Sequence, residues 1–530
     1  MSKPQLTRRN EIFNQQAQST LYESRYDLSK VSHGSFRMGV LYPIYCRNDI
    51  HPGDKWSLSS APFLRLMALI NPALTEIDVE VRYFFVPRRL VWSNWKRFIS
   101  PTTSDDVALI EPFIFNYEGI NKPTQTVVYN VAGSIYDYMG QSCIPWYLTG
   151  GTNNIYGSQH YINDSLQIDF PSWYEIGQNN PVKVMDTYFE TNANNPIKMS
   201  AYPYLAYNLI WNEYFRDENL QGEAYGSTVL NGSISGSKFG LKRVNWQKDY
   251  FTSALPFVTQ SIFSTPTIQD GDTIETLREQ SALTKWLELQ AIGGHRYQES
   301  ILTHFGVHVP DEAAQVPIYL GGGKCPIQIG SVEQTTPASS LNTTPLATLG
   351  GRGTASDSHF IDKFMFKEHG TVLGLMYIRP RVVYADVTPK DLFPKGRHDY
   401  YYPAFANLGD EAVKCDELNP GFCELDHPDD DFGYQMRYAS MRTSFDQVHG
   451  QLRPLESLES WTQARSWTDV ADGTLDNAVA SIQVSDKFIE CKPSNRIFAV
   501  LQDSDNIVGD VITFVDAIRP LPGYVDPKID

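Results

Sequence analysis

Residues 76–86 read EIDVEVRYFFV, and this run indicates the fold class more clearly than any other part of the chain. Side chains of an extended chain alternate between two faces, so the run separates into two sets. One set is apolar or aromatic: Ile77, Val79, Val81, Tyr83 and Phe85. The other set is mostly polar: Glu76, Asp78, Glu80, Arg82 and Phe84. The pattern predicts a β-strand with one face in the core, which Pro87 ends.

Further strands are predicted late in the chain, where short aromatic and β-branched runs are separated by Gly, Pro or Asp. These runs are residues 371–378, 381–384, 482–490, 496–502 and 511–518. Three amphipathic segments predict helices between the strands: residues 88–99, 203–219 and 274–292. Strands at both ends of a chain are typical of Greek-key sandwiches and jelly rolls, so the fold class is mainly β.

Composition limits the possible function. The 530 residues carry a net charge of −17, so the average surface does not bind nucleic acid, although a local basic patch can. Six cysteines spread along the chain predict no disulfide framework. There is no apolar run of membrane-spanning length, and the first 30 residues have no apolar core of a signal peptide. We therefore expect no membrane insertion.

Catalytic and metal-binding motifs are incomplete, and we predict no catalytic residue, no metal and no cofactor. The glycines of residues 321–324 lack the Ser or Thr of a phosphate loop, which favours a plain turn before the strand-like residues 326–329. Residues 232–236 place Ile where a nucleophile elbow needs Ser. Three other groups lack part of a metal-site pattern: His304 with His308; Cys415, Cys423 and His427; and Asp426, Asp429, Asp430 and Asp431.

The basic side of the predicted helix 88–99 is a candidate nucleic-acid interface. Cations there can contact phosphates, and an aromatic ring at the boundary can stack on bases. The candidate residues are Arg88, Arg89, Trp92, Lys96 and Arg97, and the N-terminal arm adds Arg8 and Arg9. The alternative is an amphipathic helix that closes one end of the sheet with its cations in water, and the residues alone favour this alternative.

A series of blocks in fixed order carries a family resemblance. The blocks are SHGSF at 32–36, PGD at 52–54, VPRRLVWSNW at 86–95, YNLIWNEYFRDENL at 207–220, DYFTSALPF at 249–257, GGHRYQE at 293–299, YPAFANLG at 402–409 and FGYQ at 432–435. Together they resemble the major capsid protein of gokushovirus-type microviruses. The resemblance covers most of residues 32–470. It implies an eight-stranded antiparallel jelly roll with long inter-strand insertions and a few helices, without enzymatic activity.

The resemblance also implies a T=1 icosahedral shell around circular single-stranded DNA, in which an insertion forms a protrusion at the three-fold axes. We expect residues 1–31 to form an N-terminal arm and residues 32–530 to form one domain with insertions. Residues 141–199 are rich in Asn, Gly, Tyr and Ser, which predicts a surface protrusion. Its candidate host-contact residues are Tyr147, Tyr156, Tyr161, Trp173, Tyr174 and Tyr188. The loops 232–242 and 335–358 are predicted to reach neighbouring subunits.

The expected partners follow from the resemblance and the charge. Copies that each carry −17 cannot neutralise a genome, so a small basic DNA-binding protein should accompany the DNA. The other expected partners are further copies of the chain, an internal scaffolding protein during assembly and a host surface receptor. The expected location is the virion, assembled in the cytoplasm of a bacterial host. The alternative function is a carbohydrate-active or carbohydrate-binding β-sandwich, for which 30 tyrosines and 10 tryptophans would suit sugar stacking. That function requires two carboxylates across a cleft.

Overall fold

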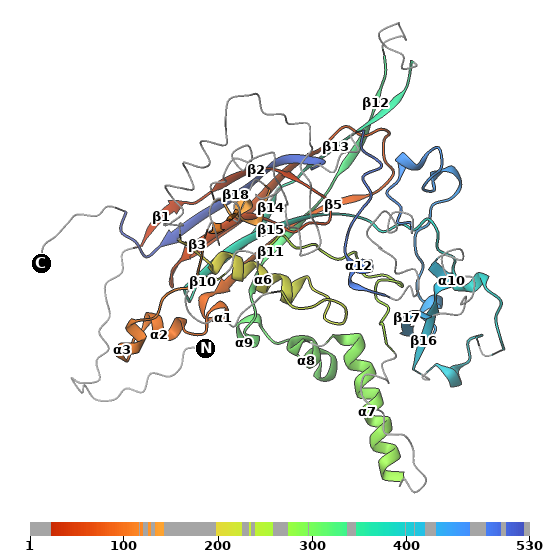
Figure 1. Cartoon of the computed structure of the whole chain (residues 1–530), viewed down its shortest axis with the longest axis horizontal. Helices are drawn as coiled ribbons and strands as arrows, with labels where there is room; N and C mark the ends of the chain where they lie inside the picture. Colours follow the sequence, from red (N-terminus) through yellow and green to blue (C-terminus); the bar gives the residue numbers. More distant parts are fainter. Residues whose placement is uncertain are drawn as a thin grey trace, which may run out of the picture.

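Two large antiparallel sheets form the centre of the computed structural model (Figure 1). The structure describes residues 23–115, 117–119, 126–128, 133–141, 198–224, 233–234, 239–257, 274–294, 296–335, 346–397, 399–406, 409–418, 431–466, 484–499 and 505–523. The fold is mainly β with a few helices, as the sequence predicts.

The first sheet has four described strands in the order β11-β5-β15-β3. They are β11 (Ile318–Pro326), β5 (Ile77–Pro87), β15 (Gly370–Pro380) and β3 (Tyr42–Ile50). The predicted strands 76–86 and 371–378 are confirmed, and they pair with each other in the centre of this sheet. The glycine run 321–324 lies inside β11 rather than in a turn, because a bulge at Gly321, with φ of +126°, lets the strand continue along β5.

The second sheet has seven described strands and brings the two ends of the described chain together. Strand β18 (Ile507–Arg519) lies between β4 (Lys55–Leu66) on one side and β1 (Ser24–Asp27) and β2 (Lys30–Phe36) on the other. The remaining strands are β12 (Gln328–Glu333), β13 (Leu349–Ser356) and β14 (His359–Met365). The predicted strand 511–518 is confirmed. The described part of the predicted arm is strand, and much of the predicted loop 335–358 is β13.

The main core lies between these sheets. Val79, Val81 and Tyr83 are at most 1 % exposed, as the alternation in β5 predicts. The hydroxyl of Tyr83 reaches across to the second sheet and lies 2.7 Å from Thr513 Oγ1 of β18. The ring of Phe85 packs 4.8 Å, centroid to centroid, from Phe366, which follows β14. The core face of β5 therefore joins both sheets.

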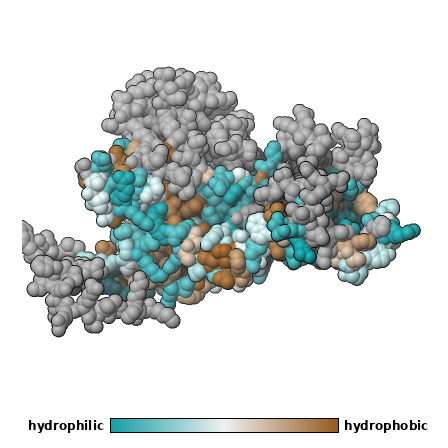
Figure 2. Space-filling view, turned by 90° about the horizontal axis from the view of Figure 1, so that it is seen from below, coloured by the Kyte–Doolittle hydropathy of each residue, from teal (hydrophilic) through white to brown (hydrophobic). Residues whose placement is uncertain are grey.

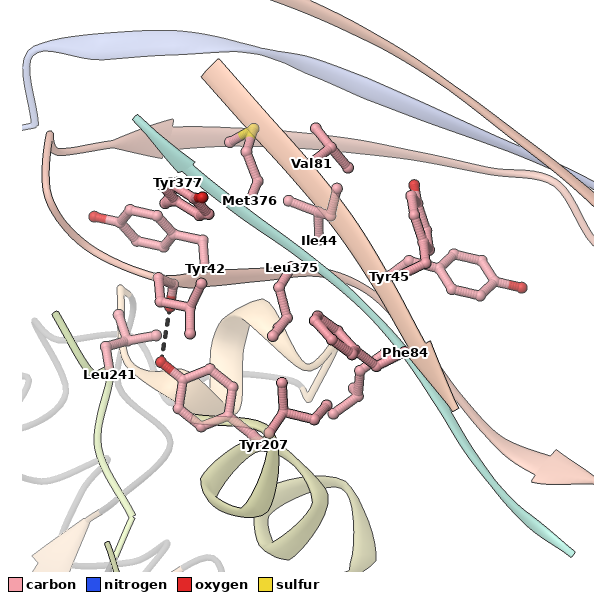
Figure 3. Close-up of a cluster of buried hydrophobic side chains, with 14 of the residues drawn as sticks. Tyr42, Ile44, Tyr45, Val81, Phe84, Tyr207, Leu241, Leu375, Met376 and Tyr377 are labelled. Atoms are coloured by element: carbon pink, nitrogen blue, oxygen red, sulfur yellow. Dashed lines mark hydrogen bonds between the residues drawn. The ribbon is translucent and has the colours of Figure 1, made fainter. Parts of the chain in front are cut away.

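Helix α6 (Tyr202–Tyr214) covers the outer face of the four-stranded sheet (Figure 3). Phe84 is fully buried there, and its ring lies 4.8 Å from Tyr214. Tyr207 points from the helix toward β3 and donates a 2.8 Å hydrogen bond to the carbonyl of Leu41, drawn in Figure 3. Because both faces of the sheet are covered, β15 is a continuous apolar run.

Two long insertions interrupt the sheets. Residues 88–317 join β5 to β11, and residues 381–506 join β15 to β18. The second insertion has its own small core around Val413, Phe432 and Phe488. Residues 249–257 connect the two insertions, since Leu255 bridges Tyr434 and Asp249 accepts a 2.7 Å hydrogen bond from Tyr384. Two blocks of the predicted family pattern, DYFTSALPF and FGYQ, thus meet in space.

The smaller elements lie mostly in these insertions. They are α3 (Ser104–Val107), β6 (Phe113–Phe115), β7 (Tyr117–Gly119), β8 (Thr126–Val128), α4 (Ile135–Tyr138), β9 (Lys198–Ser200), β10 (Ser233–Ile234), α7 (Ile274–Gly293), α8 (Tyr297–Phe305), α9 (Asp311–Ala314), η5 (Lys390–Leu392), η6 (Pro403–Phe405), β16 (Asp410–Lys414), α10 (Cys415–Leu418), β17 (Asp431–Met436), η7 (Ala439–Met441), η8 (Gly450–Leu452), η9 (Glu459–Trp461) and α12 (Asp486–Ile489). The predicted helix 274–292 is confirmed as α7.

Other predicted elements are corrected. Helix α6 ends at Tyr214 rather than at residue 219, because Phe215 leaves the helical conformation and packs its ring on Phe84 and Tyr377. Residues 381–384 contribute only a bridge at Tyr384. The described parts of the other two predicted strands are turns, isolated bridges at Glu490 and Phe498, and the helix α12. Within 232–242, Leu241 is a core residue, so this end of the predicted loop does not extend outward.

Candidate nucleic-acid interface after strand β5

The basic segment follows β5 as two short helices, α1 (Arg88–Val91) and α2 (Trp95–Ile99), rather than one continuous helix. The break is at Trp92, whose backbone is extended, with φ of −140° and ψ of 112°. The indole is 0 % exposed and packs 5.4 Å from the ring of Phe98. Burial of this large ring determines the break, because a continuous helix would hold Trp92 at the boundary of the basic side.

This burial removes Trp92 from the candidate base-stacking residues. A ring that stacks on a nucleotide must present a free face, and Trp92 has none in the folded subunit. Trp95 is also buried, at 8 % exposure. The aromatic side chains of this segment are therefore part of the core.

Arg88 is largely committed to contacts within the subunit. Its guanidinium lies 5.0 Å from the ring centroid of Trp95 and 4.8 Å from that of Tyr202. It also donates a 2.6 Å hydrogen bond to the carbonyl of Asn48 in β3. Cation–π contacts and a charged donor on a strand carbonyl hold the start of α1 against the four-stranded sheet.

Arg89 and Arg97 each form an ion pair. Arg89 Nε lies 2.6 Å from Glu368, and its side chain is 20 % exposed. Arg97 lies 2.6 Å from Asp106, but its own side chain is 57 % exposed. Backbone N–H donors at Thr102 and Thr103, together with Arg97, hold the pKa of Asp106 well below its usual range. Asp106 is thus charged and neutralises part of the basic segment.

Lys96 and Arg97 are the cations of this segment that face solvent. Lys96 is exposed, and no ion pair holds it within the described part of the chain. The geometry supports a structural role for Arg88 and Arg89, in agreement with the alternative that the residues alone favour. A contact with phosphates would be restricted to the exposed end of α2.

The other candidate contact residues lie outside the described residues: Arg8, Arg9, Tyr147, Tyr156, Tyr161, Trp173, Tyr174 and Tyr188. The two ends of the predicted protrusion are described. Gln141 hydrogen-bonds to the hydroxyl of Tyr204 on α6, and Lys198–Ser200 forms β9, which pairs with β6. Residues 198–200 therefore belong to the body of the subunit.

Comparison with known proteins identifies the family. The model of the family described as capsid protein (F protein) matches residues 15–145, 177–270 and 258–529. The chain belongs to the F-type capsid proteins of the microviruses. It is similar to three proteins named capsid protein VP1. That of Chlamydia phage 1 is 27 % identical, with 98 % of this chain and 97 % of that protein covered. That of Bdellovibrio phage phiMH2K is 26 % identical, with 95 % of this chain and 95 % of that protein covered. That of Spiroplasma virus 4 is 23 % identical, with 81 % of this chain and 82 % of that protein covered.

Membership of the F-type capsid family decides several questions that the residues left open. The chain is a major capsid protein of a microvirus, which is a single-stranded DNA phage, and it is a component of the virion. The family is structural rather than enzymatic, which excludes the carbohydrate-active alternative. No helix within the described residues combines the length and apolar character that a membrane span requires.

The carbohydrate-active alternative requires two carboxylates across a cleft. In this capsid protein two carboxylates line a cavity of about 910 Å³ in the second insertion. Glu411 and Glu417 line it, and burial raises the pKa of Glu417. Both carboxylates surround one ammonium group, since Lys390 Nζ lies 2.6 Å from Glu411 and 3.7 Å from Glu417. This is an ion-pair cluster within the insertion rather than a free acid and base.

Some residues of the incomplete metal-site patterns have other contacts in the capsid protein where they are described. His304 stacks on Trp286, with centroids 5.5 Å apart, and its Nε2 lies 2.9 Å from Gln290. Asp431 pairs with Lys414 at 2.8 Å. No three described His, Cys, Asp or Glu side chains cluster in a way that could hold a metal ion. His427 and Cys423, with Asp426, Asp429 and Asp430, lie outside the described residues.

Sequence reasoning missed one buried charge cluster of the capsid protein. Asp54 of the PGD turn is 0 % exposed and forms a 3.1 Å ion pair with Arg519 at the end of β18. The only available signal was the PGD block itself, because residues 54 and 519 lie at opposite ends of the chain.

Proposed function

We propose that this chain is the major structural protein of a T=1 icosahedral shell and that its two sheets form an eight-stranded jelly roll. The strand order carries the proposal. Strands β2-β18-β4-β14 face β3-β15-β5-β11, and the chain crosses from one sheet to the other at each step among these eight strands except from β5 to β11. This order, in which the first and last strands pair, is the order expected of two interleaved Greek keys.

The insertions support a shell function. A jelly roll alone needs few of the residues in 88–317 and 381–506, so these insertions are available to contact neighbouring copies. Closed shells consist of repeated contacts between such surfaces of identical subunits. The chain assembles in the cytoplasm of its bacterial host with the help of an internal scaffolding protein.

The predicted protrusion 141–199, without its ends at Gln141 and β9, lies at the three-fold axes and contacts a host surface receptor. Its two ends support this location. Gln141 hydrogen-bonds to Tyr204 of α6, the helix that follows β9 in the chain. The segment therefore leaves the body and returns to it at one place. An insertion of this kind extends outward without disturbing the sheets.

The shell encloses circular single-stranded DNA. Lys96 and Arg97 at the end of α2, together with Arg8 and Arg9, contact its phosphates, while Trp92 does not stack on bases because it is buried. A net charge of −17 per chain leaves most phosphates without a protein cation. A small basic DNA-binding protein supplies the remaining positive charge.

Electron microscopy of particles purified from infected or co-expressing cells tests the proposal. Uniform shells whose map fits one copy of the chain per icosahedral asymmetric unit, with β2-β18-β4-β14 opposite β3-β15-β5-β11, support it. Dispersed monomers, or a map that requires a different strand order, would overturn it.

A further inference from the structure

Helices α7 and α8 form a hairpin that exposes several large apolar side chains beside the exposed charged residues of α7. We call residues 274–305 the α7–α8 unit. Leu302 and Phe305 of α8 are 52 % and 77 % exposed, and Leu283 and Leu289 of α7 are 45 % and 41 % exposed. Val307, just after α8, is 55 % exposed. The unit lies at the edge of the subunit away from the sheets (Figure 1), and Figure 2 shows apolar patches among hydrophilic ones on the side of the molecule seen from below.

The unit is rigid within itself. Gln290 of α7 is buried, accepts a hydrogen bond from Ser300 at 3.0 Å and lies 2.9 Å from the ring nitrogen of His304. The ring of His304 stacks on Trp286 at an interplanar angle of 12°. At the turn between the helices, a Cβ on Gly293 would lie 2.0 Å from Thr303, so the two helices approach closely. These contacts fix α8 against α7.

Arg296 anchors the base of the unit to the body. Its guanidinium donates 2.9 Å hydrogen bonds to the carbonyls of Asn212 and Arg216 at the end of α6. It also pairs with Glu218 at 3.1 Å. A surface that is held rigidly before binding loses little conformational entropy when a partner covers it.

The contacts with α7 leave helix α8 without a buried side chain. None of its nine residues, all of which the structure describes, is buried. Helices of fewer than about 12 residues are marginal in water unless they pack against other structure. Among the described side chains of α7, only Leu287 and Gln290 are buried. The unit therefore presents the surface of a helix pair that is half of a larger packing arrangement.

We infer that the α7–α8 unit docks on a second copy of this chain in the shell. This inference rests on the proposed shell function and names the surface that carries one of its contacts. The surface is present on every subunit, and in a shell the partner present in equal number is another subunit. Single-stranded DNA does not fit, because α8 has the sequence YQESILTHF without Lys or Arg, and the two cations of α7, Arg278 and Lys285, are outnumbered by its three glutamates.

Hydrogen exchange measured on free subunits and on shells assembled from the purified chain tests the inference. The amides of residues 297–305 should exchange on the order of tenfold more slowly in shells than in free subunits. Rapid exchange of this peptide in intact shells would overturn the inference. So would protection that appears only when other virion proteins are present. If the wild-type chain forms no shells at all, the proposed function fails instead.

Substitution provides a second test. Phe305→Asp and Leu302→Asp should leave the unfolding midpoint of free subunits unchanged, because neither side chain is buried, and should lower shell yield by on the order of tenfold. Phe305→Leu and Leu302→Met are the matched controls, since they keep an apolar side chain at the same exposed positions and should retain shell yield. Wild-type shell yield from both Phe305→Asp and Leu302→Asp would overturn the inference.

Discussion

Arg519 and Asp54 form a buried ion pair that joins the last strand of the fold to the turn between β3 and β4. Arg519 Nη2 lies 3.1 Å from Asp54, and the two side chains are 5 % and 0 % exposed. Arg519 also pairs with Asp49 at 3.1 Å and lies 2.8 Å from the Nδ1 atom of His51. Because β3 and β18 belong to different sheets, the cluster fixes one sheet relative to the other at this end.

Asp54→Ala should destabilise the subunit by about 3 kcal/mol, because it leaves a buried guanidinium with one carboxylate fewer. Urea denaturation of free subunits measures the loss. Arg25→Ala is the control, since it removes an exposed ion pair with Asp516 on the same strand β18 and should leave stability nearly unchanged. Equal effects of the two substitutions would contradict a special role for the buried pair.

Trp92→Ala should cost about 3–5 kcal/mol, since it removes a fully buried indole and leaves a cavity beside Phe98 and Tyr202. Trp92→Phe should cost less because it keeps part of the packing. The measurement is the denaturation midpoint of purified subunits. A stable Trp92→Ala subunit with impaired DNA retention would instead restore Trp92 as a nucleic-acid contact.

Lys96→Gln should leave folding and shell formation intact and reduce the DNA that shells retain. The slope of log K against log salt for single-stranded DNA binding should also fall by about 0.7, the effect of one lost phosphate contact. Lys324→Gln is the control, since Lys324 is 60 % exposed and pairs with Asp78 on another part of the surface. The same loss in both variants would attribute the effect to net charge rather than to α2.

His369 should make stability depend on pH. Burial, the neighbouring Arg88 and the His51 ring 5.9 Å away lower its pKa from 6.5. The unfolded chain therefore binds more protons below pH 6.5, and stability falls as the pH decreases from 6.5 toward the folded-state pKa. Urea denaturation at pH 7.5 and pH 5.5 should show a smaller difference for His369→Gln than for the wild type. If the stability difference between the two pH values were the same in His369→Gln and in the wild type, His369 would be excluded as a source of the pH dependence.

Replacement of residues 142–197 by a short Gly-Ser linker should preserve shells and abolish adsorption to host cells. The reason is that Gln141 and β9 already meet the body near α6, so a short linker can join them. Adsorption assays and particle maps measure the two outcomes. Loss of shells would assign the segment to contacts between subunits, and normal adsorption would place the receptor site elsewhere.

Strands were predictable where the pattern is local. The alternation of β5 and the apolar runs of β15 and β18 each reflect the environment of one strand, so the sequence alone located them. The segments 482–490 and 496–502 have similar composition, but their described residues 484–490 and 496–499 pack in the small core of the second insertion or beside the residues that follow β4. Apolar composition reports burial, and it does not report whether the backbone pairs with another strand.

The candidate interface was predictable only as a set of cations. The sequence located Arg88, Arg89, Lys96 and Arg97 on one short segment. It could not report that Glu368 and Asp106 neutralise two of them, because the three-dimensional fold brings these carboxylates to the segment. For the same reason the sequence placed Trp92 at the boundary of the basic side of a helix, whereas packing against Phe98 and Tyr202 encloses it.

The sequence by itself determined the mainly β class, the central strands, the position of α7 and, through ordered blocks, the capsid family. These properties depend on side-chain periodicity and on local order along the chain. Only the tertiary structure decided which strands pair, that Asp54 meets Arg519, which cations remain free and that the α7–α8 unit is uncovered. Each of these depends on contacts between residues that are distant in the sequence, and the free energy of such contacts arises only when the fold removes both partners from water.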